Sequence, residues 1–385
     1  PDPGELYLPL FSRRFSFTDL CVRDGEHVRP GKVLARDPSN HGVGLLAPRA
    51  GTVHLGAAAG HVVLRDIAAG DAEPLDDSGG PSHIPREMGS VGMKRYKLLM
   101  LGAWQYFFDA HSGALPNPFG APRAVIVSTL NLEPFLGRGD VQLRTRLGSF
   151  TRGLEQLQSL LEYQPTYLVL PRIAADLAEQ VSQAVRGYAY VKPVHVPLRY
   201  PFDNFTVLAR YLGLRRDNDQ PVWALRTEGV LALDRALTAS RPCDLRVISI
   251  GGPAATEAVH VAATPGYPLK ELLAGRVAEE PVRVLNGGAL TGKAIPPDQL
   301  GLDCECTGIT AIGEQTQREF LSFARPGAGR WSYSRCFLSA LRAPMPERMT
   351  TAVRGEHRPC VSCGFCEEVC PAGIMPHLLH KLLHQ

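Results

Sequence analysis

The sequence lacks the features that place a chain across a membrane, on a nucleic acid or outside the cell. None of its apolar stretches approaches the roughly 20 residues of a membrane-spanning helix, so we expect a soluble or peripheral protein. No signal peptide is visible. The net charge of +3 over 385 residues is close to balance, and we therefore predict no nucleic-acid partner.

Signals for nucleotide binding and for hydrolysis are equally scarce. No Gly-x-Gly-x-x-Gly joins a strand to a helix, and no Ser/His/Asp arrangement or carboxylate pair stands out. Residues 287–293 match the phosphate-loop pattern up to its lysine. However, Ala294 stands where Ser or Thr would bind Mg²⁺, and Pro296 and Pro297 prevent the helix that would hold phosphate. We predict no bond-making catalytic site on this chain.

What the sequence does contain is a C-x2-C-x2-C-x3-C-P run near its C-terminus, the spacing of bacterial ferredoxins. Thiolates are the soft ligands that iron–sulfur clusters require. A structural zinc site is the competing interpretation, but zinc sites usually present two separated C-x2-C pairs. We predict one [4Fe-4S] cluster and no other metal site. Its expected ligands are Cys360, Cys363, Cys366 and Cys370.

The identity of the fourth cluster ligand is open at this point. In two-cluster ferredoxins the fourth cysteine of each run ligates the other cluster, and this chain has only one run. Cys370 therefore either closes the local cluster or lies beside it. The alternatives are Cys304, Cys306, Cys336 or a residue of a partner chain, whereas the Cys304-Glu-Cys306 segment by itself predicts free cysteines. We favour four local ligands.

Patterning along the chain predicts a multidomain α/β protein. Residues 1–70 alternate short apolar runs with glycine-closed turns, as in a β barrel-sandwich hybrid of the biotinyl/lipoyl type. Residues 71–97 are the expected linker. The β-then-α alternation of residues 98–244 predicts a Rossmann-like, doubly wound α/β domain. Residues 245–345 predict a small α+β (SLBB-like) region, and residues 346–385 a ferredoxin-type helical Fe-S segment.

Individual elements can also be predicted. Strands are expected at 124–127, 167–170, 188–196 and 246–250, and helices at 173–185 and 269–273. The residues at helical spacing on one face are Leu143, Leu147, Phe150, Leu154, Leu157 and Leu161.

The C-terminal segment predicts a short helix that begins at Pro376, a position where proline is favoured. We expect the leucines of this helix to seal the cluster against the preceding domain, and its histidines to line a solvated or partner-facing surface. The leucines are Leu378, Leu379, Leu382 and Leu383, and the histidines are His377, His380 and His384.

Several short motifs, taken with the order of the domains, carry a family resemblance. The chain resembles the A subunit of the Na⁺-translocating NADH:quinone oxidoreductase (NqrA), and it is also similar to the C subunit of the Rnf complex (RnfC). The NqrA-like motifs are residues 101–104 with Pro116, Pro118 and Pro122, then 123–127, 249–253, 286–292, 319–321 and 334–338. The RnfC-like motifs are residues 131–134 and 199–201 and the cysteine run.

The chain departs from both families. RnfC carries a Gly-rich flavin/NADH loop where this chain reads Leu-Gly-Ala-Trp-Gln-Tyr-Phe at 101–107, and it carries two cysteine runs instead of one. NqrA typically lacks the cysteines altogether. We therefore expect neither FMN nor NAD on this chain, and the cysteine run is an addition relative to NqrA.

The resemblance implies a peripheral subunit on the cytoplasmic side of the inner membrane. Its implied partners are the membrane-embedded B/D-like subunit of an NQR/RNF-type, ion-translocating NADH:quinone or NADH:ferredoxin oxidoreductase, other redox subunits, and quinone. No quinone-contact residue can be transferred to this sequence.

Three functions remain open at this point. The first is an electron relay and docking platform, and the second is a structural assembly subunit whose cluster only stabilises the C-terminal tail. The third, disfavoured by the missing loop, is a flavin-binding subunit like RnfC.

Overall fold

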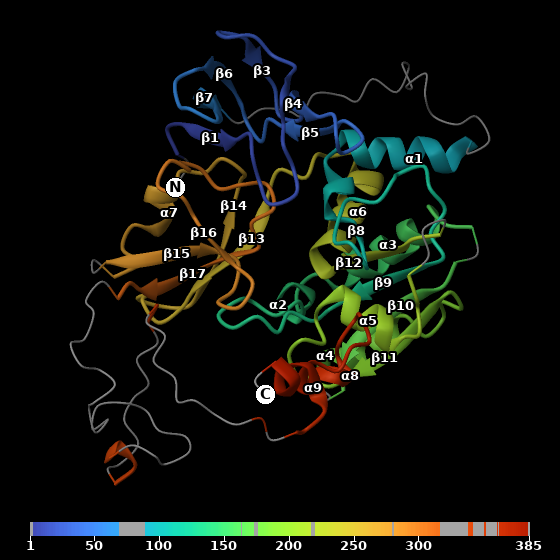
Figure 1. Cartoon of the computed structure of the whole chain (residues 1–385). Coiled ribbons are helices and arrows are strands. Elements are labelled where there is room, and N and C mark those ends of the chain that lie inside the picture. The colour runs from blue at the N-terminus through green and yellow to red at the C-terminus, as the bar shows by residue number, and fades with distance from the viewer. Residues whose placement is uncertain are drawn as a thin grey trace.

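The computed structural model describes residues 3–68, 89–162, 164–172, 176–216, 220–278, 281–315, 338–341, 350–351, 360 and 362–383. Most of the predicted linker, the motifs at 319–321 and 334–337, Cys336 and His384 lie outside these residues. The predicted α/β class is confirmed, because helices accompany several separate sheets (Figure 1). Within the described part of the chain, none of the helices has the length and apolar character that crossing a membrane requires.

Two small antiparallel sheets form the N-terminal part. Alternate residues of their strands point inward, and Leu6, Leu34 and Leu64 meet in one buried core. One sheet has the order β1-β7-β6-β3 and the other β2-β4-β5. Their bounds are β1 Leu6–Pro9, β2 Asp19–Leu20, β3 His27–Val28, β4 Val33–Asp37, β5 Val43–Leu46, β6 Ala50–Leu55 and β7 His61–Ala68.

A mostly parallel sheet of order β11-β10-β9-β12-β8 follows. Its strands are β8 Phe108–Asp109, β9 Ala124–Ser128, β10 Thr166–Pro171, β11 Val191–Val196 and β12 Val222–Arg226. The central strands β9 and β12 are apolar along most of their length because both faces of the sheet are covered.

The helices around this sheet include the helix and the apolar helical face that the sequence predicts. They are α1 Gly89–Met100, η3 Ala103–Tyr106, α2 Asp140–Leu143, α3 Leu147–Gln158, α4 Asp176–Ala184, α5 Phe205–Tyr211 and α6 Thr227–Ala239. The helix expected at 173–185 is α4, and the strand expected at 124–127 is β9. The apolar face from Leu143 to Leu161 is divided between α2 and α3, with a turn between them. In β9, Val125 and Val127 lie on the face of the sheet that α3, α4 and α6 cover. Ile126 lies on the opposite face, which α5 covers.

The strand expected at 188–196 is shorter than predicted. β11 begins only at Val191, because the Tyr188 N–H bonds back to the Val185 carbonyl and the Val191 N–H bonds to the Tyr188 carbonyl. Tyr188 and Tyr190 stack on each other in this turn, with ring centroids 5.5 Å apart. The aromatic residues that resemble a strand therefore form a packed turn.

A third sheet, of order β14-β13-β17-β15-β16, contains the strand and the helix predicted at 246–250 and 269–273. Its elements are β13 Arg246–Gly251, β14 Val259–Ala263, α7 Leu269–Leu273, β15 Val282–Asn286, β16 Lys293–Ala294 and β17 Gly308–Gly313. Residues 287–292 connect β15 to β16 as a hairpin, where a phosphate loop would connect a strand to a helix. The Glu133 carboxylate accepts hydrogen bonds from the Leu290 N–H (3.1 Å) and the Thr291 hydroxyl (2.7 Å) in this turn.

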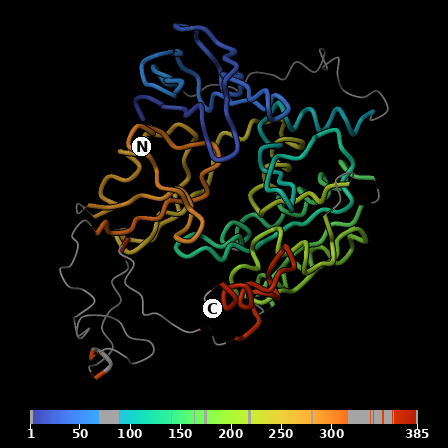
Figure 2. The backbone as a smooth tube through the Cα atoms, in the orientation of Figure 1, coloured from blue at the N-terminus to red at the C-terminus, as the bar shows by residue number. Residues whose placement is uncertain are grey.

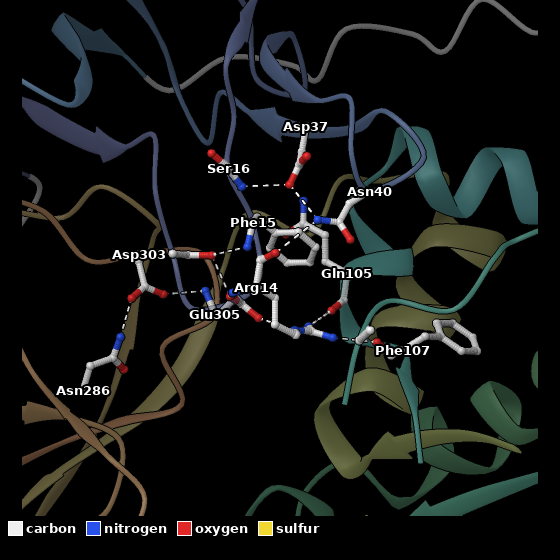
Figure 3. A network of polar contacts seen from close by, with 12 residues as sticks. Arg14, Phe15, Ser16, Asp37, Asn40, Gln105, Phe107, Asn286, Asp303 and Glu305 are labelled. Carbon is white, nitrogen blue, oxygen red and sulfur yellow. Dashed lines mark hydrogen bonds and ion pairs between the residues drawn. The ribbon is translucent and has the colours of Figure 1, made fainter. Parts of the chain in front are cut away.

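The three sheet regions meet around Arg14 (Figure 3). Its guanidinium pairs with Glu305, which precedes β17 in the sequence. It also donates to the carbonyls of Gln105 and Phe107, which precede the first strand of the parallel-sheet region, β8. The Ser12 hydroxyl adds a 2.6 Å hydrogen bond to the Glu305 carboxylate. Arg14 thus connects the N-terminal sheets to both other parts, through its ion pair with Glu305 and its hydrogen bonds to the two carbonyls.

The chain ends on the parallel-sheet side of the molecule, at the end away from the N-terminal sheets (Figure 2). The short helices there lie beside α5 (Figure 1). Their bounds are α8 Phe365–Glu368 and α9 Pro376–Leu383. Another short helix, η5 Leu338–Leu341, precedes them in the sequence.

Candidate metal centre

The cysteine run lies in a surface turn around α8. Cys360, Cys363 and Cys366 are exposed and Cys370 is half-buried. Two residues within the turn have positive φ, Gly364 at 74° and Ser362 at 54°. Positive φ is rare for a residue with a side chain and is concentrated at functional sites. The backbone therefore turns sharply on both sides of the second thiol, Cys363.

Apolar side chains within the run fix it to the parallel-sheet region. Phe365 and Val369 pack against the core that contains Phe202 and Phe205. The guanidinium carbon of Arg199 lies 3.2 Å from the centroid of the Phe365 ring, which is a close cation–π contact. With these two side chains turned inward, the thiols face outward. We did not predict this contact from the sequence motif. The aromatic residue between two of the cysteines, Phe365, could have indicated it.

Hydrogen-bond donors surround the sulfurs. The Ser362 N–H donates to Cys360 Sγ at 3.4 Å, and His377 Nδ1 lies 3.8 Å from Cys366 Sγ. The backbone N–H of Ile374 lowers the pKa of the Cys370 thiol, helped by those of Ala372 and Gly373 and by the positive charge of Arg210, while desolvation opposes the shift. N–H donors directed at sulfur are what clusters use to stabilise thiolate ligands.

The donor set fits an iron–sulfur cluster in its chemistry. Four cysteines lie within one short segment of the chain, and thiolates are ligands that Fe–S clusters require, whereas Mg²⁺ and Ca²⁺ prefer oxygen ligands. Among the residues described, no three His, Cys, Asp or Glu side chains are drawn together into a closed metal site. The turn thus supplies the ligand type and the wrapping, and the role of the four cysteines as ligands stays a prediction.

The structure bears on the fourth-ligand alternatives. Cys304 and Cys306 are only 7% and 1% exposed and belong to cores beneath the N-terminal and third sheets. Burial, reinforced by the nearby carboxylates of Glu305 and Asp303, raises the pKa of Cys304 well above its usual value. Neither forms a disulfide. The structure brings neither into the cysteine turn, whose residues pack on a different core.

The expectation that the α9 leucines seal the cluster is wrong. Phe365 and Val369 make the contact with the parallel-sheet region instead, so α9 lies further out. Its leucines are exposed, and Leu382 and Leu383 keep 68% and 85% of their surface.

The polar side chains of α9 agree better with prediction. His377 is half-buried and His380 is exposed, in accord with the predicted surface position. The Lys381 ammonium reaches back to the Ser362 hydroxyl at 3.1 Å. Helix α9 is therefore tied to the cysteine turn by a polar contact.

Comparison with known proteins confirms the NqrA resemblance. The A subunit of the Na(+)-translocating NADH-quinone reductase of Alcanivorax borkumensis is 26% identical over 368 residues, which cover 94% of this chain and 79% of the relative. The corresponding protein of Shewanella amazonensis is 25% identical over 364 residues, and that of Glaesserella parasuis 27% over 374 residues, with the same coverage of both chains. No family model matches the chain.

Among solved structures, an NAD⁺-reducing [NiFe]-hydrogenase in its air-oxidised state aligns with 62% of this chain, at a TM-score of 0.42 and 14% identity. The chain spans about half the length of that hydrogenase chain, with 50% of it covered.

Proposed function

We propose that this chain, a homologue of NqrA over 94% of its length, is a peripheral subunit of a redox complex of the Na(+)-translocating NADH-quinone reductase type. The proposal is supported by relatives from several organisms that carry this name over nearly the whole chain. Electron transport coupled to ion transport is the activity that their names describe.

We further propose that the chain relays electrons through its cysteine turn. A [4Fe-4S] cluster held by Cys360, Cys363, Cys366 and Cys370 would supply one-electron transfer. The observation that carries this proposal is the turn itself, with apolar side chains anchored inward and three of its four cysteines exposed. An exposed redox site can approach a partner's cofactor, whereas a purely structural site has no need of the surface.

The finer architecture belongs to the same proposal. The two small sheets support a barrel-sandwich hybrid for residues 1–70, with 71–97 as the linker, and the strand order β11-β10-β9-β12 supports a Rossmann-like domain at 98–244. The mixed sheet with α7 supports an SLBB-like region at 245–345. Helices α8 and α9 support a ferredoxin-type segment at 346–385.

Docking on a membrane-embedded B/D-like subunit, on the cytoplasmic side of the inner membrane, is part of the same proposal and rests on the resemblance to NqrA. Exposed apolar side chains at Ile374, Met375 and along α9 support a contact surface beside the cysteine turn. Other redox subunits and quinone complete the proposed partners.

Electron paramagnetic resonance of the anaerobically purified chain, before and after dithionite, tests the relay, with iron and sulfide quantified in parallel. We expect about four irons per chain and a signal that appears on reduction. Cys363→Ser should abolish both. Cys21→Ser is the matched control, because Cys21 is also an exposed free cysteine but lies in the N-terminal sheets. Zinc at the same cysteines, without iron, would contradict the relay.

The alternative, a structural assembly subunit, is favoured by one contact. The bond from Lys381 to Ser362 joins α9 to the turn, so a metal there would also hold the tail in place. A cluster that resists dithionite, combined with a large loss of thermal stability in Cys363→Ser, would favour this alternative. Stoichiometric FMN in the purified chain would instead revive the flavin-binding alternative.

A further inference from the structure

A small cavity of about 50 Å³ opens at the carboxyl ends of β9 and β12. Ser128 and Arg226, the last residues of these neighbouring parallel strands, pair in register and both line it. The strand order reverses between β9 and β12, because the chain proceeds from β9 outward to β10 and β11 and then returns to the other side. Open α/β sheets bind their ligands at such a switch point.

An unsatisfied hydroxyl points to a ligand here. Thr227, the first residue of α6, is only 2% exposed and lines the cavity, and its Oγ1 has no hydrogen-bond partner. Buried polar atoms nearly always have partners, and an orphaned one calls for an explanation. The 13-residue helix α6 also starts at this point, and the first N–H groups of a helix lack partners within it.

The charges around the cavity favour an anion. Two arginines, Arg226 and Arg138, line the cavity, and so does His260 of β14 in the third sheet. Arg226 also donates to the Leu130 carbonyl at 3.1 Å, which fixes its position. The cavity is therefore lined by cationic and hydrogen-bond-donating groups from two sheets.

The opposing group is Glu228, whose carboxylate lies 3.6 Å from Arg246 and leaves Oε1 without a partner. Burial raises the pKa of Glu228, although Arg246 and Arg146 oppose the shift. A carboxyl whose pKa is raised ionises less readily, so Glu228 opposes an anion less strongly than an ordinary glutamate would.

Two glycines set the size of the site. A Cβ at Gly139 would overlap the Thr129 carbonyl oxygen and lie 2.9 Å from Thr227 Oγ1. A Cβ at Gly137 would lie 2.6 Å from His260 Cε1. The loop backbone therefore lies so close to the other cavity-lining groups that only glycine fits at these two positions. The remaining space suits a few water molecules or one phosphate-sized group.

We propose that this cavity binds a tetrahedral oxyanion, a phosphate group that accepts hydrogen bonds from Thr227, from the start of α6 and from Arg226. The proposal is independent of the cysteine turn and of the redox function. The phosphate group is either free inorganic phosphate or the phosphate of a mononucleotide whose remaining part projects outside.

Isothermal titration calorimetry of the full chain with inorganic phosphate, and separately with AMP, tests the site. Thr227→Val removes the orphaned hydroxyl at nearly constant shape, and we expect it to weaken phosphate binding about tenfold. Glu228→Gln removes the opposing charge and should strengthen binding. Thr166→Val is the matched control, because Thr166 Oγ1 is also buried without a partner but lies at the amino end of β10.

Phosphate binding that is lost in Thr227→Val and kept in Thr166→Val supports the site. Tighter binding of AMP with the same dependence on Thr227 identifies a nucleotide phosphate, and equal or weaker binding identifies free phosphate. The proposal is overturned if neither compound binds, or if the two threonine variants bind alike.

Discussion

The cysteines of this chain differ in burial and in hydrogen bonding, and these differences shift their pKa values in opposite directions. Cys304 and Cys306 are buried, and desolvation raises the pKa of each thiol far above neutrality. In Cys370, backbone N–H groups, that of Ile374 first, lower the pKa. Metal ligation requires thiolate, so the surface turn holds the cysteine that is better prepared to ligate.

At the residue scale we predict that Cys370→Ser lowers the iron content and alters the reduced EPR signal of the anaerobically purified chain, because a ligand is lost. Cys304→Ser should leave the iron content unchanged and lower the free energy of unfolding by about 1–3 kcal/mol, because a hydroxyl is buried in an apolar core. Iron lost from Cys304→Ser, with full iron in Cys370→Ser, would assign the fourth ligand to the core instead.

Among the elements, α3 and α6 approach closely because a glycine stands at their contact. A Cβ at Gly153 of α3 would overlap the Val230 carbonyl oxygen of α6 and lie 2.7 Å from Val230 Cγ1. Val230 is buried and belongs to the core over the parallel sheet, so neither helix can shift without opening that core. The small residue therefore determines the distance between the helices.

Gly153→Ala is predicted to lower the free energy of unfolding by about 3 kcal/mol or more, measured by urea denaturation, because the added methyl overlaps backbone. Gly148→Ala on the same helix is the matched control. Its Cβ would meet only Arg152 Nη1, at 3.8 Å, and alanine favours helix, so we expect a gain of about 0.5 kcal/mol. Equal effects of the two changes would refute the close contact.

On the scale of the whole molecule, Arg14 contacts all three sheet regions, and its ion pair with Glu305 joins two of them (Figure 3). Burial opposes the ionisation of Glu305, but the charge of Arg14 and hydrogen bonds from Ser12 and Arg14 outweigh it and lower the pKa of the carboxyl. A carboxyl whose pKa is lowered on folding stabilises the fold when ionised. This contribution is present above the unfolded value of 4.5 and is lost as the pH falls through the lowered folded value.

We predict that Glu305→Gln lowers the free energy of unfolding at pH 7 by about 3 kcal/mol, because the buried Arg14 loses its countercharge. The difference from the unsubstituted chain should shrink below pH about 4.5. Urea denaturation at pH 7 and pH 4 measures both effects. Glu314→Gln is the control, since its ion pair with Arg283 is exposed and should matter far less. A difference that is constant with pH would contradict the assignment.

Much of the local structure could be predicted from the sequence. The helix at 269–273, the strands at 124–127 and 246–250 and the helix that begins at Pro376 are all present, because periodicity and proline placement act over a few residues. The turn at 188–190 was mistaken for a strand, since its stacked tyrosines have the composition of one. The leucines of α9 were expected to be buried because amphipathic spacing does not reveal which face of a helix finds a partner.

The sequence by itself determined the candidate donor cysteines, because the cysteines of a C-x2-C-x2-C motif lie within one short segment and their spacing is local. Contacts between distant segments were decided only by the tertiary structure. Phe365 meets Arg199, Arg14 meets Glu305, and Thr227 meets the loop at Gly139 after long stretches of intervening chain. Such pairs depend on strand order and on burial, and no short-range pattern encodes either one.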